Sequence, residues 1–312
     1  MKLLKSVLFT AFAAAIVCQP MANAQTPPSP RDLGKALGFS ADEITQIENG
    51  EVVSKDLSEG SDKELAGVVA VYFKKPVSEV LELAMQAKGL KTDPQTQAFN
   101  VWKPEDSADE AFANLGLAAS ETDEAGLFAD AEAGSKLNLS TVEINQFGQG
   151  ASAPAAVSAQ LRKMLKARYE AYLKKGLAGI APYDRGGGKT VSPAEEITLA
   201  IKETMKLGRR NDFFQSLLDY PAKPVAGVEN RFFWIKRQVE NRPTFILAHR
   251  SSIENTNAAL MAEEQFYVGH SYNANFLAAG ALEVNGGSMI FYVNRTFTDQ
   301  VAGFGSGLKH SI

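Results

Sequence analysis

The sequence predicts an α+β fold in which a curved antiparallel sheet packs against helices. Residues 277–284 and 287–295 are rich in apolar side chains and flank Asn285-Gly286, the residue pair that most favours a two-residue hairpin turn. Residues 65–73 form another β-rich run near the start of the chain, whereas residues 155–174 have apolar side chains at helical spacing. Strands at both ends of the sequence with helices between them indicate one sheet assembled from distant segments.

The N-terminal segment, residues 1–24, has the three parts of a secretory signal peptide. Lys2 and Lys5 give a positive start, residues 7–17 are the apolar centre, and a small-residue cleavage site ends at Ala24. The apolar part is shorter than the roughly 20 residues that a membrane-spanning helix needs. The sequence therefore predicts Sec-type export, cleavage after Ala24, and a periplasmic or secreted protein without an integral membrane segment after processing.

Composition argues against several classes of function. The chain has 32 basic and 36 acidic residues, and removing residues 1–24 takes away two lysines and no acids, leaving a net charge near −6. This balance argues against nucleic acid and anionic membrane surfaces as partners. Cys18 is the only cysteine, and no two of His249, His270 and His310 have metal-ligand spacing on one element. We expect no metal and no cofactor, and no catalytic motif is present.

The processed chain is predicted to be a single domain. Three prolines between residues 25 and 31 predict a flexible leader at residues 25–39. Residues 40–312 follow as one α+β domain, which begins with a short helix capped by Ser40. A first strand pair is predicted from residues 51–55 and 65–73. Pro76 then opens a helix, and the apolar stripe of this helix consists of Val77, Val80, Leu81 and Ala84.

The middle of the chain is less regular. Residues 91–150 have few clear patterns, although residues 99–102 read as a strand, and alternation at residues 137–144 favours a strand or an extended arm. Residues 155–174 form the clearest helix. We expect the helices to make an insertion at about residues 151–220, before the late strands begin.

The hairpin also predicts its own register. With Asn285 and Gly286 as the loop, opposed residues alternate between the two faces of the sheet. One face takes the pairs Leu282 with Met289, Gly280 with Phe291, Ala278 with Val293 and Phe276 with Arg295. The first strand is rich in Ala and Gly, and such small residues leave room either for a closely crossing helix or for a bound molecule.

Several segments resemble known proteins. These are GEVVSKDLSEGSDKELAGVVAVYF (residues 50–73), FFWIKRQVENRPTFILAH (232–249), QFYVGHSY (265–272) and FYVNRTFTD (291–299). They are similar to an uncharacterised family of exported bacterial proteins, over about half of the processed chain. The strand pair followed by a helix at a proline also resembles the START-like, or helix-grip, fold. That resemblance implies a curved antiparallel sheet that wraps a long C-terminal helix around an apolar cavity.

A polar group beside an apolar surface is the candidate site. A regular strand before the hairpin would project His270, Tyr272 and Phe276 to the face that carries Arg295, with Asp299 just beyond it. Arg295 could then bind a carboxylate, and His270 and Tyr272 are weak candidates for acid–base catalysis. The predicted ligand-binding residues are Arg295, Tyr272, His270, Phe276, Phe291 and Asp299.

Two other interpretations remain open for this group. A bulge near Asn273 would turn His270 and Tyr272 to the opposite face. The group could also be an internal network in which Arg295 pairs with Asp299 or Glu264.

The sequence predicts an exported protein that holds a hydrophobic or amphipathic, lipid-like small molecule between sheet and helix. One alternative is an enzyme of the cyclase, dehydratase or hydrolase type that uses the His-Tyr-Arg cluster. The other is a structural or interaction protein of the cell envelope.

Overall fold

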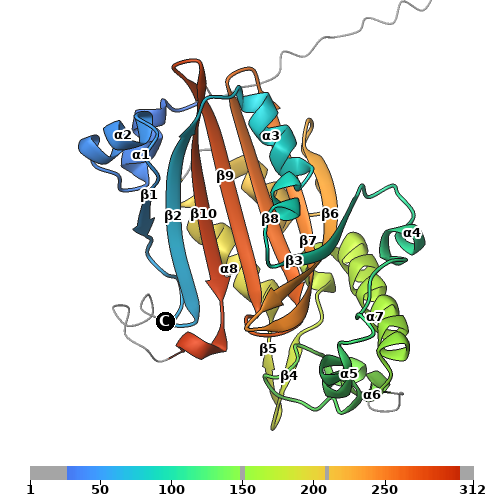
Figure 1. Cartoon of the computed structure of the whole chain (residues 1–312). Helices are drawn as coiled ribbons and strands as arrows, with labels where there is room; N and C mark the ends of the chain where they lie inside the picture. Colours follow the sequence, from blue (N-terminus) through green and yellow to red (C-terminus); the bar gives the residue numbers. More distant parts are fainter. Residues whose placement is uncertain (1–26, 148–151, 208–210, 303–312) are drawn as a thin grey trace, which may run out of the picture.

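A computed structural model of the chain describes residues 27–147, 152–207 and 211–302 (Figure 1). Within these residues the frame is one open antiparallel sheet of eight strands, in the order β1-β2-β10-β9-β8-β7-β6-β3. The strands are β1 (Val53–Asp56), β2 (Glu64–Phe73), β3 (Thr96–Trp102), β6 (Glu229–Val239), β7 (Arg242–Asn255), β8 (Ala258–Val268), β9 (Ala274–Val284) and β10 (Gly287–Phe297). The predicted α+β class, with an antiparallel sheet packed against helices, is confirmed. Early β2 lies beside late β10, so both ends of the sequence supply the sheet.

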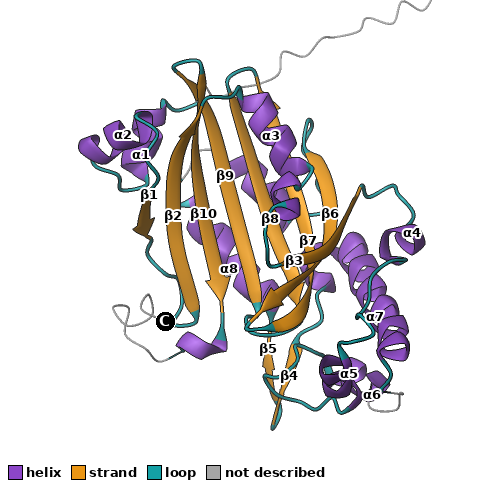
Figure 2. Cartoon of the chain, in the orientation of Figure 1, coloured by secondary structure: helices purple, strands orange, loops and turns teal. Residues whose placement is uncertain are grey.

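Helices lie on both sides of the sheet (Figure 2). They are α1 (Pro30–Ala36), α2 (Ala41–Glu48), α3 (Val77–Met85), α4 (Ala108–Phe112), α5 (Thr122–Ala129), α6 (Thr141–Phe147), α7 (Pro154–Lys175), α8 (Pro193–Met205) and α9 (Asn211–Leu218). Smaller elements are η1 (Lys88–Lys91), η2 (Gly176–Gly179), η3 (Asp299–Val301) and the hairpin of β4 (Tyr183–Gly186) with β5 (Lys189–Val191). Over the described ranges, none of the helices has the length and apolar character to cross a membrane.

The β9–β10 hairpin has the predicted register. Asn285 and Gly286 form the turn with φ angles of 49° and 73°, and both are positive as a type I′ turn requires. Val284 pairs with Gly287, and the pairing continues without a shift to the far ends of the two strands. The turn chemistry thus sets which side chains share a face along the whole hairpin.

One face of the sheet, here called the back face, is buried. On β2 it presents Ala66, Val68 and Ala70, which are 3% exposed or less. Helices α1 and α2 cover the end near the β9–β10 turn, where the Phe39 and Phe291 rings lie 6.1 Å apart. Helices α7, α8 and α9 cover the remainder in one continuous apolar cluster with the sheet. The helices of the predicted insertion therefore share the back layer of the core with α1 and α2.

The opposite face, here called the front face, is covered only over part of its area by α3. Figure 1 looks onto this face, with α3 crossing in front of β8 and β9. Val77 of α3 packs against Ala259 and Ala281, and the α3 segment near Met85 packs against Leu277 of β9. On the back of β9, a Cβ added to Gly280 would lie 3.9 Å from Leu33 of α1. The small residues of β9 thus admit closely packed helices on both faces, which confirms the crossing-helix interpretation.

Two predicted segments are wrong. The predicted flexible leader, residues 25–39, contains α1, and Leu37 and Phe39 are buried because they pack against the back face. Residues 137–144, predicted as a strand or an extended arm, lead into α6 instead. Ser140 and Glu143 form a reciprocal cap there, with the Ser140 N–H 2.7 Å from the Glu143 carboxylate. Ser29 likewise caps α1 by accepting the Asp32 backbone N–H at 3.1 Å, so in both segments a cap at the helix start outweighs the pattern used for prediction.

Some predictions fall outside the described residues. The signal peptide at residues 1–24 lies there, as does the chain after residue 302. The long C-terminal helix implied by the helix-grip resemblance is not among the described elements, since β10 is followed by η3.

Candidate ligand-binding site

Arg295 projects from the back face as predicted, but it is held inside the core. Its side chain is 2% exposed, and Nη1 lies 2.7 Å from Oε1 of Glu64, which is itself fully buried. The Arg295 Nε donates to Thr204 Oγ1 at 3.2 Å. The internal-network interpretation is therefore the correct one for Arg295, although its partner is Glu64 and neither Asp299 nor Glu264.

The other predicted back-face residues are also internal. Phe276 and Phe291 are 0% and 2% exposed, and they pack beneath helices of the back layer. Asp299 lies in η3, where its carboxylate is 2.7 Å from Nζ of Lys63 and 3.1 Å from Nε of Arg185. This ion-pair cluster is separate from Arg295, so Asp299 does not complete the predicted site.

His270 and Tyr272 do not share the face of Arg295, and this part of the prediction is wrong. The cause is a β-bulge, because β7 pairs Leu247 with Tyr267 and Ala248 with Gln265, which leaves Phe266 as an extra residue in β8. The Tyr272 hydroxyl consequently donates to Gln265 Oε1 at 2.8 Å on the front face.

His270 lies in the turn after β8, with Nε2 2.5 Å from Thr244 Oγ1 and Nδ1 2.6 Å from Ser271 Oγ. The six predicted ligand-binding residues therefore do not converge, and Arg295 does not lie beside the weak catalytic pair. Tyr272 reaches the front face, where it packs against a small apolar cluster.

The environment of His270 predicts a loss of stability in acid. Burial lowers the pKa of His270 to about 4, and nearby Arg242 adds to the effect, although Glu240 opposes it. The unfolded chain, with a histidine pKa of about 6.5, binds this proton more readily. His270 therefore contributes stability above about pH 6.5, which is lost as pH falls towards 4.

We expect His270→Gln to reduce the fall in unfolding free energy between pH 7 and pH 4.5 by about 2 kcal/mol. Urea unfolding at the two pH values measures the difference. An unchanged pH dependence would show that His270 does not titrate in this way.

An open groove lies on the front face beside the first edge of the sheet. It encloses about 580 Å³ over β1, β2 and β10. Two rows of paired residues build its floor. The upper row is Ser54, Val69 and Tyr292, and the lower row is Asp56, Gly67 and Asn294. Gly67 has no side chain, so the lower row is hollowed at its centre.

An apolar strip borders this groove along β2. The front-facing residues of β2 alternate with its buried ones and are half-buried, and Phe73 at the end of the strand is 47% exposed. The strip consists of Leu65, Val69, Val71 and Phe73. A row of accessible apolar side chains on a sheet face is unusual, because such a face is normally covered by another layer.

Polar side chains lie on the other side of the groove. The Asn275 amide donates to Asn294 Oδ1 at 2.7 Å and to Thr296 Oγ1 at 2.8 Å, which fixes the orientation of Asn294. Tyr292 is 37% exposed, and among the described residues its hydroxyl has no hydrogen-bond partner. Burial and the nearby Glu263 carboxylate raise the pKa of Tyr292 to about 12, so the hydroxyl stays protonated and available as a donor.

Sequence reasoning did not select this groove. Both faces of residues 65–73 are apolar, which is typical of a strand covered on two sides. The front face is open because β1 has only four residues and covers little of the ten-residue β2 edge, and because α3 is short. Neither can be judged before the strand order is known.

No metal site is placed among the described residues, since no group of three or more His, Cys, Asp and Glu side chains could hold an ion there. Comparisons with protein-family models, with curated proteins and with solved structures give no match.

Proposed function

We propose that this protein binds an amphipathic small molecule in the front-face groove between β1 and β10. The observation that carries the proposal is the apolar strip of β2, which is left accessible beside a fixed polar row. An apolar ligand body would lie along Leu65 and Val69, while a polar end would reach Tyr292 and Asn294. The groove has a volume of about 580 Å³, which falls within the usual range for small-molecule sites.

The proposed ligand is of the class that the sequence predicts, but its site is the front-face groove and not the space between sheet and helix. The space between β9 and its helices is filled by packed side chains, as described above, so the ligand is placed on the open part of the sheet. Catalysis by His270, Tyr272 and Arg295 is not supported, because their hydrogen-bond partners lie on different sides of the sheet. Export through residues 1–24 remains part of the proposal and is tested by N-terminal sequencing of the protein recovered from cells.

A neutral, fluorescent amphipathic dye, Nile red, tests the groove. We expect saturable binding to the purified protein with a blue-shifted emission, because the dye leaves water for an apolar surface. Val69→Glu should weaken binding at least about tenfold, since binding would then desolvate a carboxylate in the apolar strip. Titration of the dye with each protein, followed by fluorescence, measures the change.

Val142→Glu is the matched control. Val142 is 65% exposed on α6, away from the groove, so the same change in charge should leave dye binding unaltered. Equal weakening by both variants would show that the loss does not come from the groove, and unaltered binding by Val69→Glu would rule out the groove as the dye site. Native mass spectrometry of protein purified from its own cells then asks which natural molecule it retains.

A further inference from the structure

A second group of polar side chains lies in the core on the back face, away from the groove. His249 and Ser251 project from the same side of β7 because they are two residues apart, and Glu264 of β8 pairs directly with His249. The Ser251 Oγ lies 3.2 Å from His249 Nε2, and His249 Nδ1 lies 3.2 Å from Glu264 Oε2. All three residues are at most 1% exposed. This is the order of atoms in a serine, histidine and carboxylate relay.

Polar neighbours at both ring nitrogens bear on the tautomer of His249. Tyr172 of α7 donates its hydroxyl proton to Glu264 Oε2, so its oxygen can accept a proton from His249 Nδ1, which lies 2.8 Å away. The pKa of Tyr172 is raised well above its usual value by burial and by the Glu264 carboxylate, so this hydroxyl keeps its proton. His249 Nε2 also lies 2.8 Å from Asn230 Oδ1, which accepts a hydrogen bond from Ser251 Oγ. When the Asn230 amide rotates and its NH2 group replaces Oδ1, the His249 proton stays on Nδ1 and Nε2 is the base that faces Ser251.

Aromatic rings hold the imidazole in place. The Phe232 ring stacks on His249 at 4.7 Å between centroids, and Tyr220 lies on it at 4.6 Å. Within the described chain, Glu264 Oε1 has no hydrogen-bond partner despite its burial. A buried carboxylate that lacks a hydrogen bond at one oxygen reduces the stability of the folded protein, so a purely structural role does not explain it. The same carboxylate stabilises an imidazolium that forms next to it.

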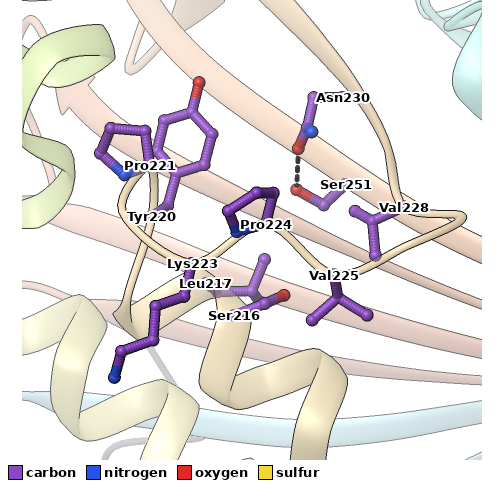
Figure 3. Close-up of a pocket in the computed structure, with 10 residues that line it drawn as sticks. All are labelled: Ser216, Leu217, Tyr220, Pro221, Lys223, Pro224, Val225, Val228, Asn230 and Ser251. Carbon is purple, nitrogen blue, oxygen red and sulfur yellow. Dashed lines mark hydrogen bonds between the residues drawn. The ribbon is translucent and has the colours of Figure 1, made fainter.

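Ser251 faces a small pocket. Figure 3 shows Ser251 and Asn230 together on one side of it, where Ser251 Oγ donates to Asn230 Oδ1 at 2.8 Å. The pocket holds about 60 Å³, and Leu217, Pro224 and Val228 are among its apolar walls. This space admits a group of about three to five heavy atoms. A short acyl group fits it, and longer acyl chains do not.

We propose that Ser251, His249 and Glu264 form an esterase site for short acyl groups. Ser251 Oγ attacks the ester carbonyl carbon while its proton passes to His249 Nε2. The carbon–oxygen bond to the alcohol then breaks, and the leaving alkoxide takes that proton. Water next attacks the acyl-serine and gives a proton to His249, which returns it to Ser251 as the carboxylic acid leaves. After rotation of its amide, Asn230 can donate a hydrogen bond to the oxyanion that forms from the ester carbonyl oxygen. Glu264 is a positioning residue that holds the imidazole of His249.

Hydrolysis of p-nitrophenyl acetate by the full-length protein tests the site. We expect turnover above the buffer rate, no turnover of p-nitrophenyl octanoate, and a loss of at least about 100-fold in Ser251→Ala. Ser252→Ala is the matched control, because Ser252 is also buried on β7 and projects to the other face, so its rate should stay within twofold of the unmodified protein. Glu264→Gln should lower kcat with little change in KM and displace the acid limb of the pH–rate profile.

Covalent labelling gives a readout that does not depend on a variant's folding. Phenylmethanesulfonyl fluoride, a small serine reagent, should modify Ser251 in the unmodified protein, as located by peptide mass spectrometry. Labelling at another residue, a buffer-level rate in the unmodified protein, or full activity in folded Ser251→Ala would each overturn the proposal. None of these outcomes bears on dye binding in the front-face groove, so the two proposals fail separately.

Discussion

Glu64→Ala is expected to destabilise the protein by about 3–5 kcal/mol, because it leaves the Arg295 guanidinium charged and unpaired in the core. Glu64 is 0% exposed and Arg295 is 2% exposed, so water cannot replace the lost carboxylate. Glu64 also accepts the Gly60 backbone N–H, and this bond is lost as well. Since small domains are stable by only about 5–15 kcal/mol, equilibrium unfolding in urea should show a greatly reduced midpoint.

Two further variants show whether the loss of stability comes from leaving a buried charge unpaired. The double variant Glu64→Leu with Arg295→Met removes both charges and should recover much of the loss, since apolar replacement of a buried pair is often neutral. Glu132→Ala breaks an ion pair with Lys136 in which both side chains are 70% exposed, and it should change stability by less than about 0.5 kcal/mol. Similar losses from Glu64→Ala and Glu132→Ala would contradict this description of the core.

Gly176→Ala is expected to cost about 2–5 kcal/mol and to disturb the pocket over Ser251. Gly176 ends α7 at φ 57° and ψ −139°, a conformation that side chains disfavour. A Cβ at this position would lie 1.9 Å from the backbone oxygen of Tyr220. Because that atom belongs to the main chain, the segment bearing Tyr220 must move, and the ring that packs on His249 moves with it. Thermal unfolding measures the stability, and the rate of p-nitrophenyl acetate hydrolysis reports on the pocket.

Gly126→Ala provides the same substitution without the collision. Gly126 lies inside α5, and a Cβ there meets nothing within 4 Å. Alanine favours a helix over glycine by about 1 kcal/mol, so this variant should be neutral or slightly stabilised. Equal destabilisation by the two alanines would show that the contact between Gly176 and Tyr220 is not the cause.

The parts of the fold that depend on neighbouring residues could be predicted from the sequence. The type I′ turn at Asn285-Gly286 dictates the register of β9 with β10, because positive φ at two positions is a strong local demand. The cap at Ser40 likewise gives α2 its start. In these elements the deciding interaction lies within a few residues of the chain.

The site depends on contacts between distant residues, and these could not be predicted. Arg295 and Glu64 are 231 residues apart, and they meet only because β10 pairs with β2. The bulge at Phe266 is set by the pairing of β8 with β7, and it decides the face on which Tyr272 lies. His249 and Glu264 become neighbours through the same ladder. Prediction of either site therefore requires the strand order first.

The front-face groove is the central claim, and thiol labelling tests it most directly. In a Cys18→Ser background, Val68→Cys and Val69→Cys place single thiols on adjacent residues of β2, which are buried and accessible respectively. Alkylation by iodoacetamide in the native protein should be fast at residue 69, slow at residue 68, and slowed at residue 69 by saturating Nile red. Equal rates at the two positions, or no protection by bound dye, would contradict an open binding groove on this face.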